Sequence, residues 1–200
     1  MSRFLLVRHA ASDWAGDRIA GRLGGIHLAA AGRQQAQQLA DSLAAEKISA
    51  IFSSPRERAY ETAQFLAAAP GKQINVAAEL DEIAYGDWTG ESFARLGELP
   101  RWRAFNSMRS CTRIPGGELI VEVQARIVGL MDRLRELPAK GVIVLVSHAD
   151  VIRTALAYYL SVPLDFMLRL EISPASVSMI AIDAEGPKIL CVNQKASVEQ

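Results

Sequence analysis

The chain has 200 residues, of which 50% are hydrophobic and 22% are charged, and its 22 Lys and Arg residues balance its 22 Asp and Glu residues. This composition argues against a disordered chain. A formal net charge of zero argues against a nucleic-acid-binding protein and against a polybasic membrane-binding protein. The length is that of one domain, or of one domain with an inserted lid, and allows a sizeable core.

Short apolar runs alternate with longer amphipathic segments along the chain. The run 3–7 predicts a buried strand, and the run 141–147 (GVIVLVS) gives the clearest strand pattern. Ser54, Pro55 and Glu57 predict a helix start, with the serine as N-cap and the proline in the first turn. In chain order, we expect strands at 3–7, 48–53, 74–77, 141–147, 176–182 and 188–192, and helices at 30–45, 54–69, 118–137 and 149–160.

Residues 86–117 have a different character. They are only weakly periodic, contain several arginines and include Trp88 and Trp102. We expect short helices there that form a lid or side wall, as an insertion within a single domain spanning residues 1–200.

Three histidines are too few for a histidine-rich metal site, and Cys111 and Cys191 belong to no CxxC pair. We interpret both cysteines as reduced thiols. The apolar run 4–7 is too short for a signal peptide, and no stretch approaches the roughly 20 apolar residues of a membrane span. We therefore expect a cytoplasmic protein that binds neither membranes nor nucleic acid.

Strands that alternate with helices predict an α/β fold, a three-layer sandwich with a largely parallel central sheet and helices on both faces. Ligands of such sheets bind outside the carboxyl ends of the strands. Polar residues follow four of the predicted strands, and they are Arg8 and His9, then Arg56 and Arg58, then Asp81 and Glu82, and finally His148.

Each of these residues also has a structural explanation. A lone histidine after a strand is more often structural than catalytic, and Glu82 could be an ordinary loop carboxylate. Arg56 and Arg58 could pair with Glu57 or Glu61. However, arginines at a helix start are unfavourable for the helix dipole unless an anion binds there. Taken together, arginines and imidazoles around a helix N-terminus predict a site for a phosphoryl group.

Four motifs resemble those of the histidine phosphatase (phosphoglycerate-mutase-like) superfamily, and they occur in the family's order. Residues 6–10 (LVRHA) resemble its LVRHG signature, and residues 146–148 resemble the start of its VSHG motif. Residues 53–63 resemble SSPxxRAxxTA, and residues 80–90 resemble LxExxxGxWxG. Further similarity at residues 20–22, Trp102 and 148–152 is closest to a bacterial branch labelled "probable phosphomutase".

The resemblance implies a catalytic role for five residues. His9 would be the nucleophile that forms a phosphohistidine, Arg8 and Arg58 would hold the phosphoryl oxygens, and His148, cationic when phosphate is bound, would be a further donor. Glu82 would protonate the leaving oxygen and then accept a proton from water, which requires a raised pKa. The arginines would replace a metal ion, so no metal or other cofactor is expected.

Substrate contacts implied by the resemblance also involve Ser12 and the backbone N–H of Ala149. The chain departs from the family pattern at four positions. Alanine replaces glycine at Ala10 and Ala149, and the family often has Asn and Gln where this chain has Ala15 and Ala20. A position that needs positive φ or a close backbone approach would disfavour alanine. We therefore expect weaker phosphate binding or a shifted substrate preference.

These features favour a metal-independent, acid-type histidine phosphatase that hydrolyses a small phosphomonoester. A phosphoglycerate-type mutase is the first alternative, although only Arg109 and Arg113 are available to bind a substrate carboxylate. A weakly active phospho-ligand-binding protein is the second. A serine or cysteine hydrolase is disfavoured because no GxSxG motif occurs.

Trp88, Trp102 and Phe105 could contact the organic part of the substrate, but core packing is favoured for them. A late exposed strand leaves a homodimer possible.

Overall fold

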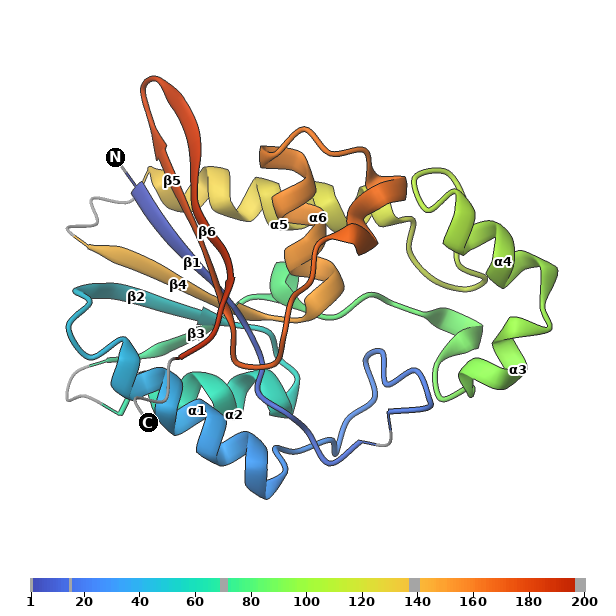
Figure 1. Cartoon of the computed structure of the whole chain (residues 1–200), viewed down its shortest axis with the longest axis horizontal. Helices are drawn as coiled ribbons and strands as arrows, with labels where there is room; N and C mark the ends of the chain where they lie inside the picture. The colour runs from blue at the N-terminus through green and yellow to red at the C-terminus, as the bar shows by residue number, and fades with distance from the viewer. Residues whose placement is uncertain (1, 15, 69–71, 137–140, 197–200) are drawn as a thin grey trace.

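The chain forms a six-stranded sheet between two layers of helices in a computed structural model that describes residues 2–14, 16–68, 72–136 and 141–196 (Figure 1). The strand order is β3-β2-β4-β1-β5-β6. The pairs β1–β4, β2–β4 and β2–β3 are parallel, whereas β5 pairs antiparallel with both β1 and β6. The strands are β1 (Ser2–Arg8), β2 (Ile48–Ser53), β3 (Ile74–Val76), β4 (Val142–Ser147), β5 (Val177–Asp183) and β6 (Gly186–Gln194).

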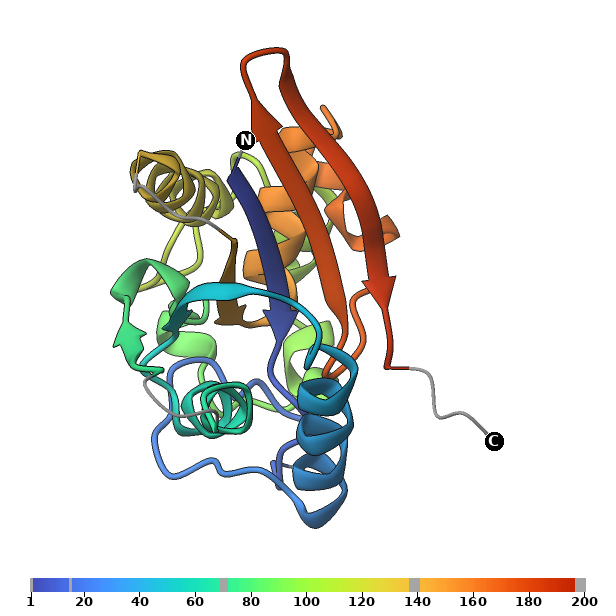
Figure 2. The same ribbon diagram turned by 90° about the vertical axis from the view of Figure 1, so that its left-hand side faces the viewer.

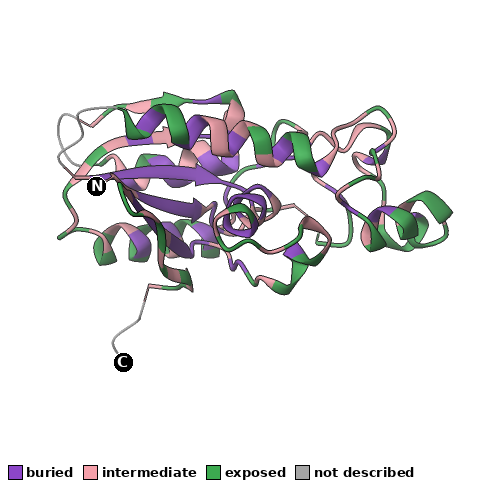
Figure 3. Cartoon of the chain, turned by 90° about the horizontal axis from the view of Figure 1, so that it is seen from above, coloured by how far each residue is buried: buried purple, intermediate pink, exposed green. Residues whose placement is uncertain are grey.

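The two faces of the sheet are covered because the central strands are apolar on both sides. In β1, Phe4 and Leu6 pack with α5 and α6, while Leu5 and Val7 pack with α1 and α2. Every residue of β4 is buried. Figure 2 shows β5 and β6 side by side at one edge, and Figure 3 shows the buried strands between the helical layers. The four covering helices are α1 (Ala30–Ser42), α2 (Glu57–Leu66), α5 (Ile120–Arg135) and α6 (Ala149–Tyr159).

The predicted fold class is confirmed, and each predicted strand and long helix is present with ends shifted by a few residues. The predicted start of the second helix is wrong. Helix α2 begins at Glu57, after an extended Arg56 that makes no side-chain cap, and not at Pro55. The Ser54 hydroxyl accepts from the Arg56 N–H at 3.2 Å and contacts the imidazole of His148 at 2.8 Å, but the backbone turns into the helix only after Arg56. The predicted helix ends near residues 69 and 137 lie outside the described residues.

The turns η1 (Ala78–Leu80), η2 (Gly86–Trp88) and η3 (Leu164–Arg169) lie in the connections, and η3 has no counterpart in the prediction. Residues 86–117 contain η2 and two short helices, α3 (Phe93–Gly97) and α4 (Pro100–Ser107). These helices project from one end of the molecule and are mostly exposed (Figures 1 and 3). Trp88 packs edge-on against Trp102 and Phe105, with ring centroids 5.2 and 5.4 Å away. These three aromatic side chains form the small core of the segment.

Gly86 packs closely against the backbone of the loop at Pro115. Its φ is +48°, and a Cβ placed there would lie 2.1 Å from the carbonyl oxygen of Pro115. We therefore expect Gly86→Ala to lower the free energy of unfolding by about 2–3 kcal/mol, through overpacking and backbone strain. Urea unfolding measures this change. Gly97→Ala is the matched control because nothing lies within 4 Å of the Cβ position. Equal unfolding midpoints for the two variants would contradict the expectation.

No helix within the described ranges is long and apolar enough to cross a membrane. Cys111 is exposed and Cys191 is partly exposed, and neither forms a disulfide.

Candidate active site

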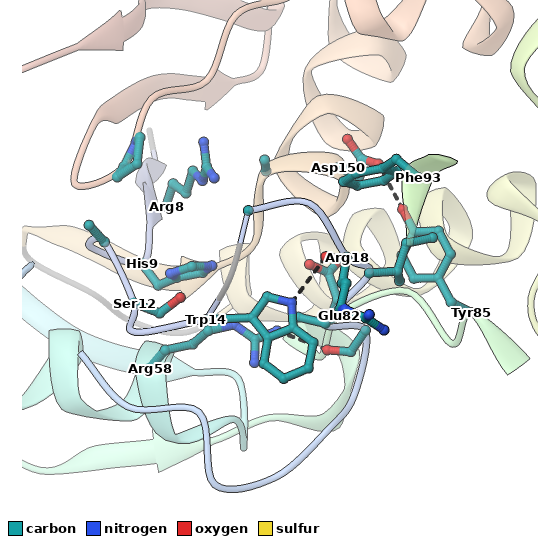
Figure 4. Close-up of a pocket in the computed structure, with 17 residues that line it drawn as sticks. Arg8, His9, Ser12, Trp14, Arg18, Arg58, Glu82, Tyr85, Phe93 and Asp150 are labelled. Atoms are coloured by element: carbon teal, nitrogen blue, oxygen red, sulfur yellow. Dashed lines mark hydrogen bonds between the residues drawn. The ribbon is translucent and has the colours of Figure 1, made fainter. Parts of the chain in front are cut away.

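A cavity of about 400 Å³ opens where β1, β2 and β4 end (Figure 4). Arg8 and His9 follow β1, Arg58 lies in the first turn of α2, and Ala149 begins α6 after β4. Four of the five predicted catalytic residues line the cavity, namely Arg8, His9, Arg58 and Glu82. The fifth, His148, lies directly behind them, with its ring centroid 5.1 Å from that of His9.

His9 is held in a defined orientation by the backbone. Its Nδ1 lies 2.8 Å from the carbonyl oxygen of Ala10, so Nδ1 carries the proton and donates it to that oxygen. Burial, aided by the neighbouring Arg58 guanidinium, lowers the pKa of His9 to about 3. The imidazole is therefore neutral at pH 7, and its Nε2 keeps a free lone pair.

Arg8 and Arg58 bring positive charge beside this lone pair. Arg58 Nη2 donates to the carbonyl oxygen of Gly21 at 2.9 Å, and Arg8 Nη1 donates to that of Ile172 at 2.6 Å. Arg58 Nη1 and Arg8 Nε are buried and have no hydrogen-bond partner. A buried guanidinium donor without a partner is costly, so these two atoms indicate a missing acceptor, such as a phosphoryl oxygen.

Glu82 and His148 lie close together, and burial shifts the pKa of each toward its neutral form. Burial raises the pKa of Glu82 to about 7, and the nearby Asp150 carboxylate raises it further. Burial also lowers the pKa of His148 well below its usual value. Nδ1 of His148 lies 3.5 Å from Glu82 Oε2, so the pair is not an ion pair while His148 is neutral. The raised pKa gives Glu82 the property that a general acid requires.

The carbonyl oxygen of Glu82 is fixed by two arginines that were not predicted as site residues. Arg22 Nε donates to it at 2.7 Å and Arg126 Nη2 at 3.2 Å. Both guanidinium groups also pair with Glu118, at 3.0 and 3.1 Å. Since Gly21 accepts from Arg58, the short segment Gly21–Arg22 contacts both the guanidinium group of Arg58 and the backbone carbonyl of Glu82.

The substitutions of glycine by alanine fit the structure. Ala10 is fully buried, and its N–H donates to the Thr62 hydroxyl at 3.0 Å. Neither Ala10 nor Ala149 adopts positive φ, so the part of the expected cost that comes from backbone strain does not arise. Ser12, Ala20 and Ala149 line the cavity. The predicted departure at Ala15 lies outside the described residues.

The other predicted contacts are elsewhere. Arg56 pairs with Asp81 at 2.9 Å, and not with Glu57 or Glu61. Arg109 is buried 3.6 Å from Asp150, and Arg113 pairs with Glu122 on the surface, so neither lines the cavity. Side chains that do line it, without having been predicted as site residues, include Trp14, Arg18, Tyr85, Phe93 and Asp150. Aromatic and charged side chains that remain exposed in a cavity would have identified these residues, but the sequence does not show which side chains are exposed.

The chain belongs to the histidine phosphatase superfamily (branch 1), whose family model matches residues 4–195. It is 36% identical over 159 residues to phosphoglycerate mutase-like protein 4 of Arabidopsis thaliana, covering 76% of this chain and 69% of that protein. It is 30% identical over 207 residues to phosphoserine phosphatase 1 of Hydrogenobacter thermophilus, covering 96% and 92%. A mycobacterial glucosyl-3-phosphoglycerate phosphatase has a similar structure, with a TM-score of 0.86, 28% identity and coverage of 97% and 99%.

Proposed function

We propose that this protein is a phosphatase that hydrolyses small phosphomonoesters through a phosphohistidine intermediate on His9. The observation that carries the proposal is the neutral His9 imidazole, whose free Nε2 lies beside two arginines with unpartnered donors. Relatives named as phosphatases support the reaction class. Cytoplasmic location and dimer formation stay predictions from the sequence.

In the first step, His9 Nε2 attacks phosphorus, and the bond between phosphorus and the ester oxygen breaks. The Glu82 carboxyl donates its proton to the leaving oxygen. In the second step, Glu82 takes a proton from water, which attacks phosphorus as the bond to His9 breaks. Arg8 and Arg58 offset the negative charge of the equatorial oxygens in both steps.

His148 changes its charge during this cycle. The bound phosphoryl dianion and the ionised Glu82 each favour protonation of His148, although burial opposes it in the free protein. A cationic His148 would donate to the transferring group. Because guanidinium and imidazolium groups supply the positive charge, we expect turnover to persist in EDTA. The acid-type assignment rests on the requirement for protonated Glu82.

The phosphoglycerate-type mutase remains the alternative, because it shares the first step and some relatives carry that name. The positions of Arg109 and Arg113, outside the cavity, favour hydrolysis over transfer to an acidic sugar. Mixing the enzyme with 3-phosphoglycerate and a bisphosphoglycerate primer tests this choice. Faster isomer formation than phosphate release would overturn the phosphatase. Equal, slow release by wild type and His9→Ala would instead indicate a phospho-ligand-binding protein.

The rate is expected to depend on pH through two groups. Glu82 must be protonated in the first step, so kcat/KM should fall as the pH rises through about 7. His9 must be neutral to attack phosphorus, so on the acid side kcat/KM should fall only below about pH 3. A profile of kcat/KM against pH checks both limbs. Glu82→Gln should remove the alkaline limb from the residual activity, and a wild-type rate that still rises above pH 7 would contradict the assignment.

Arg22 is expected to act as a positioning residue for Glu82. Arg22→Met removes the donor at 2.7 Å from the Glu82 carbonyl, so kcat should fall about 10- to 100-fold with little change in KM, because a small displacement of the acid is costly. Arg22→Lys should restore part of the loss. Steady-state kinetics measure the split, with the exposed Arg95→Met as control. A rise in KM alone would contradict this role.

A further inference from the structure

The cavity has a second end, away from His9, whose wall is built from two distant parts of the chain. The N–H of Ile19 donates to Glu91 O at 3.0 Å, and the N–H of Gly90 donates to Ile19 O at 2.8 Å. The N–H of Phe93 donates to Asp17 O at 2.9 Å. These bonds join the loop after β1 to the segment that leads into α3, so the outer wall is one preformed surface.

Two large aromatic side chains face this end of the cavity. Phe93 is 47% exposed and lines the cavity, whereas Trp88 and Phe105 of the same segment are buried. Trp14 lines it from the opposite segment, and its indole N–H donates to the carbonyl of Arg18 at 3.0 Å, which fixes the ring (Figure 4). Apolar rings kept in a cavity indicate a surface that a ligand covers.

The polar side chains at this end of the cavity offer few free hydrogen-bond donors to a second anionic group of a ligand. The Asp150 carboxylate lines the cavity and accepts from Arg153 Nη1 at 2.6 Å and from the Tyr85 hydroxyl at 3.1 Å. Arg109 lies behind it at 3.6 Å. Arg18, at the exposed mouth, donates Nη1 to the carbonyl of Gly90 at 3.1 Å. Arg153 and the Tyr85 hydroxyl thus serve the protein's own Asp150 carboxylate, which would repel a carboxylate of the substrate. Arg109 Nη1 and Nε make no hydrogen bond, but Arg109 is buried and does not line the cavity.

We propose that Trp14 and Phe93 make this site selective for phosphomonoesters with a flat, uncharged ring over those with a small carboxylate-bearing group. This inference rests on the proposed phosphatase function. It differs from the phosphoserine and glucosyl-3-phosphoglycerate named for the relatives. The ring would lie between the indole of Trp14 and the phenyl of Phe93, while the phosphoryl group reaches His9.

Two esters with primary alkoxide leaving groups separate ring recognition from leaving-group chemistry, namely 2-phenylethyl phosphate and n-butyl phosphate. For the wild type, we expect kcat/KM to be about 10-fold or more higher for the phenylethyl ester, because the ring buries apolar area. In Trp14→Ala and Phe93→Ala this ratio should fall toward one, with the butyl ester changed less than about twofold. Phe166→Ala is the matched control, since Phe166 is 44% exposed and does not line the cavity.

Binding of 2-phenylethylphosphonate, measured by calorimetry, keeps the inference testable without turnover. It should weaken about 10-fold in Trp14→Ala and Phe93→Ala even if the wild type proved inactive, which would overturn the phosphatase but not the ring subsite. An unchanged ratio and unchanged binding in both variants would overturn the subsite. A higher kcat/KM for O-phosphoserine than for the phenylethyl ester would also overturn it and favour the Arg18 mouth as a carboxylate site.

Discussion

Replacement of His9 by alanine is expected to lower kcat by about 10³-fold or more, because it removes the neutral imidazole that lines the cavity beside the arginines, and His148, the other imidazole near Arg58, does not line the cavity. Arg58 and Arg8 keep their places through their hydrogen bonds to Gly21 and Ile172, so phosphate binding should persist in the variant. Phosphate release from a generic phosphomonoester measures kcat, and competition by inorganic phosphate measures binding.

His27→Ala is the matched control for this experiment. His27 is exposed and its Nδ1 contacts Glu61 at 2.5 Å, outside the cavity, so its loss should leave kcat nearly unchanged. A His9→Ala enzyme that turns over within about tenfold of the wild type would exclude His9 as the nucleophile.

Replacement of Glu82 by glutamine is expected to lower kcat/KM for alkyl phosphates by about 10²- to 10⁴-fold, since the amide cannot protonate an alkoxide. For 4-nitrophenyl phosphate the loss of kcat/KM should be much smaller, because nitrophenolate leaves without a proton and kcat/KM does not contain the later attack of water on the phosphohistidine. The measurement is the ratio of the two losses. Glu98→Gln serves as the control, since Glu98 is exposed and pairs with Arg95 on the surface. Equal losses for the two substrates would show that Glu82 acts otherwise than as the general acid.

The fold was predictable because its central strands are apolar on both faces and its helices carry regular apolar spacing. The wholly buried β4 gives the strongest pattern, and it is the strand before His148. The start of α2 was not predictable, because the Ser54 hydroxyl both accepts from the Arg56 N–H and contacts His148, which is 94 residues away, while Arg56 stays extended. Local sequence rules do not contain such a long-range contact.

The grouping of the candidate catalytic residues was predictable from the ends of the predicted strands and from the order of the motifs. Arg8, His9, Arg58, Glu82 and His148 lie together because parallel strands place their carboxyl ends on one rim. The contacts of other side chains that hold these residues in place were not predictable. Arg22 and Glu118 meet across 96 residues to hold the Glu82 segment, and neither side chain carries a local signal of that contact.

The outer end of the cavity was missed for a related reason. Sequence reasoning named Trp88, Trp102 and Phe105 as aromatic candidates, and these residues pack on one another as a small core. Trp14 and Phe93 face the cavity instead. Burial of an aromatic residue depends on the tertiary packing of its neighbours. The residue type alone therefore does not distinguish a core aromatic residue from one that lines a cavity.

Rapid acid-free quenching of a single turnover with a ³²P-labelled phosphomonoester tests the central claim most directly. The account predicts a burst of alkali-stable, acid-labile label, which peptide mapping locates on His9, and the label should decay at the rate of phosphate release. The label should be absent in His9→Ala. Steady turnover without covalent label, or label on a residue other than His9, would contradict the mechanism.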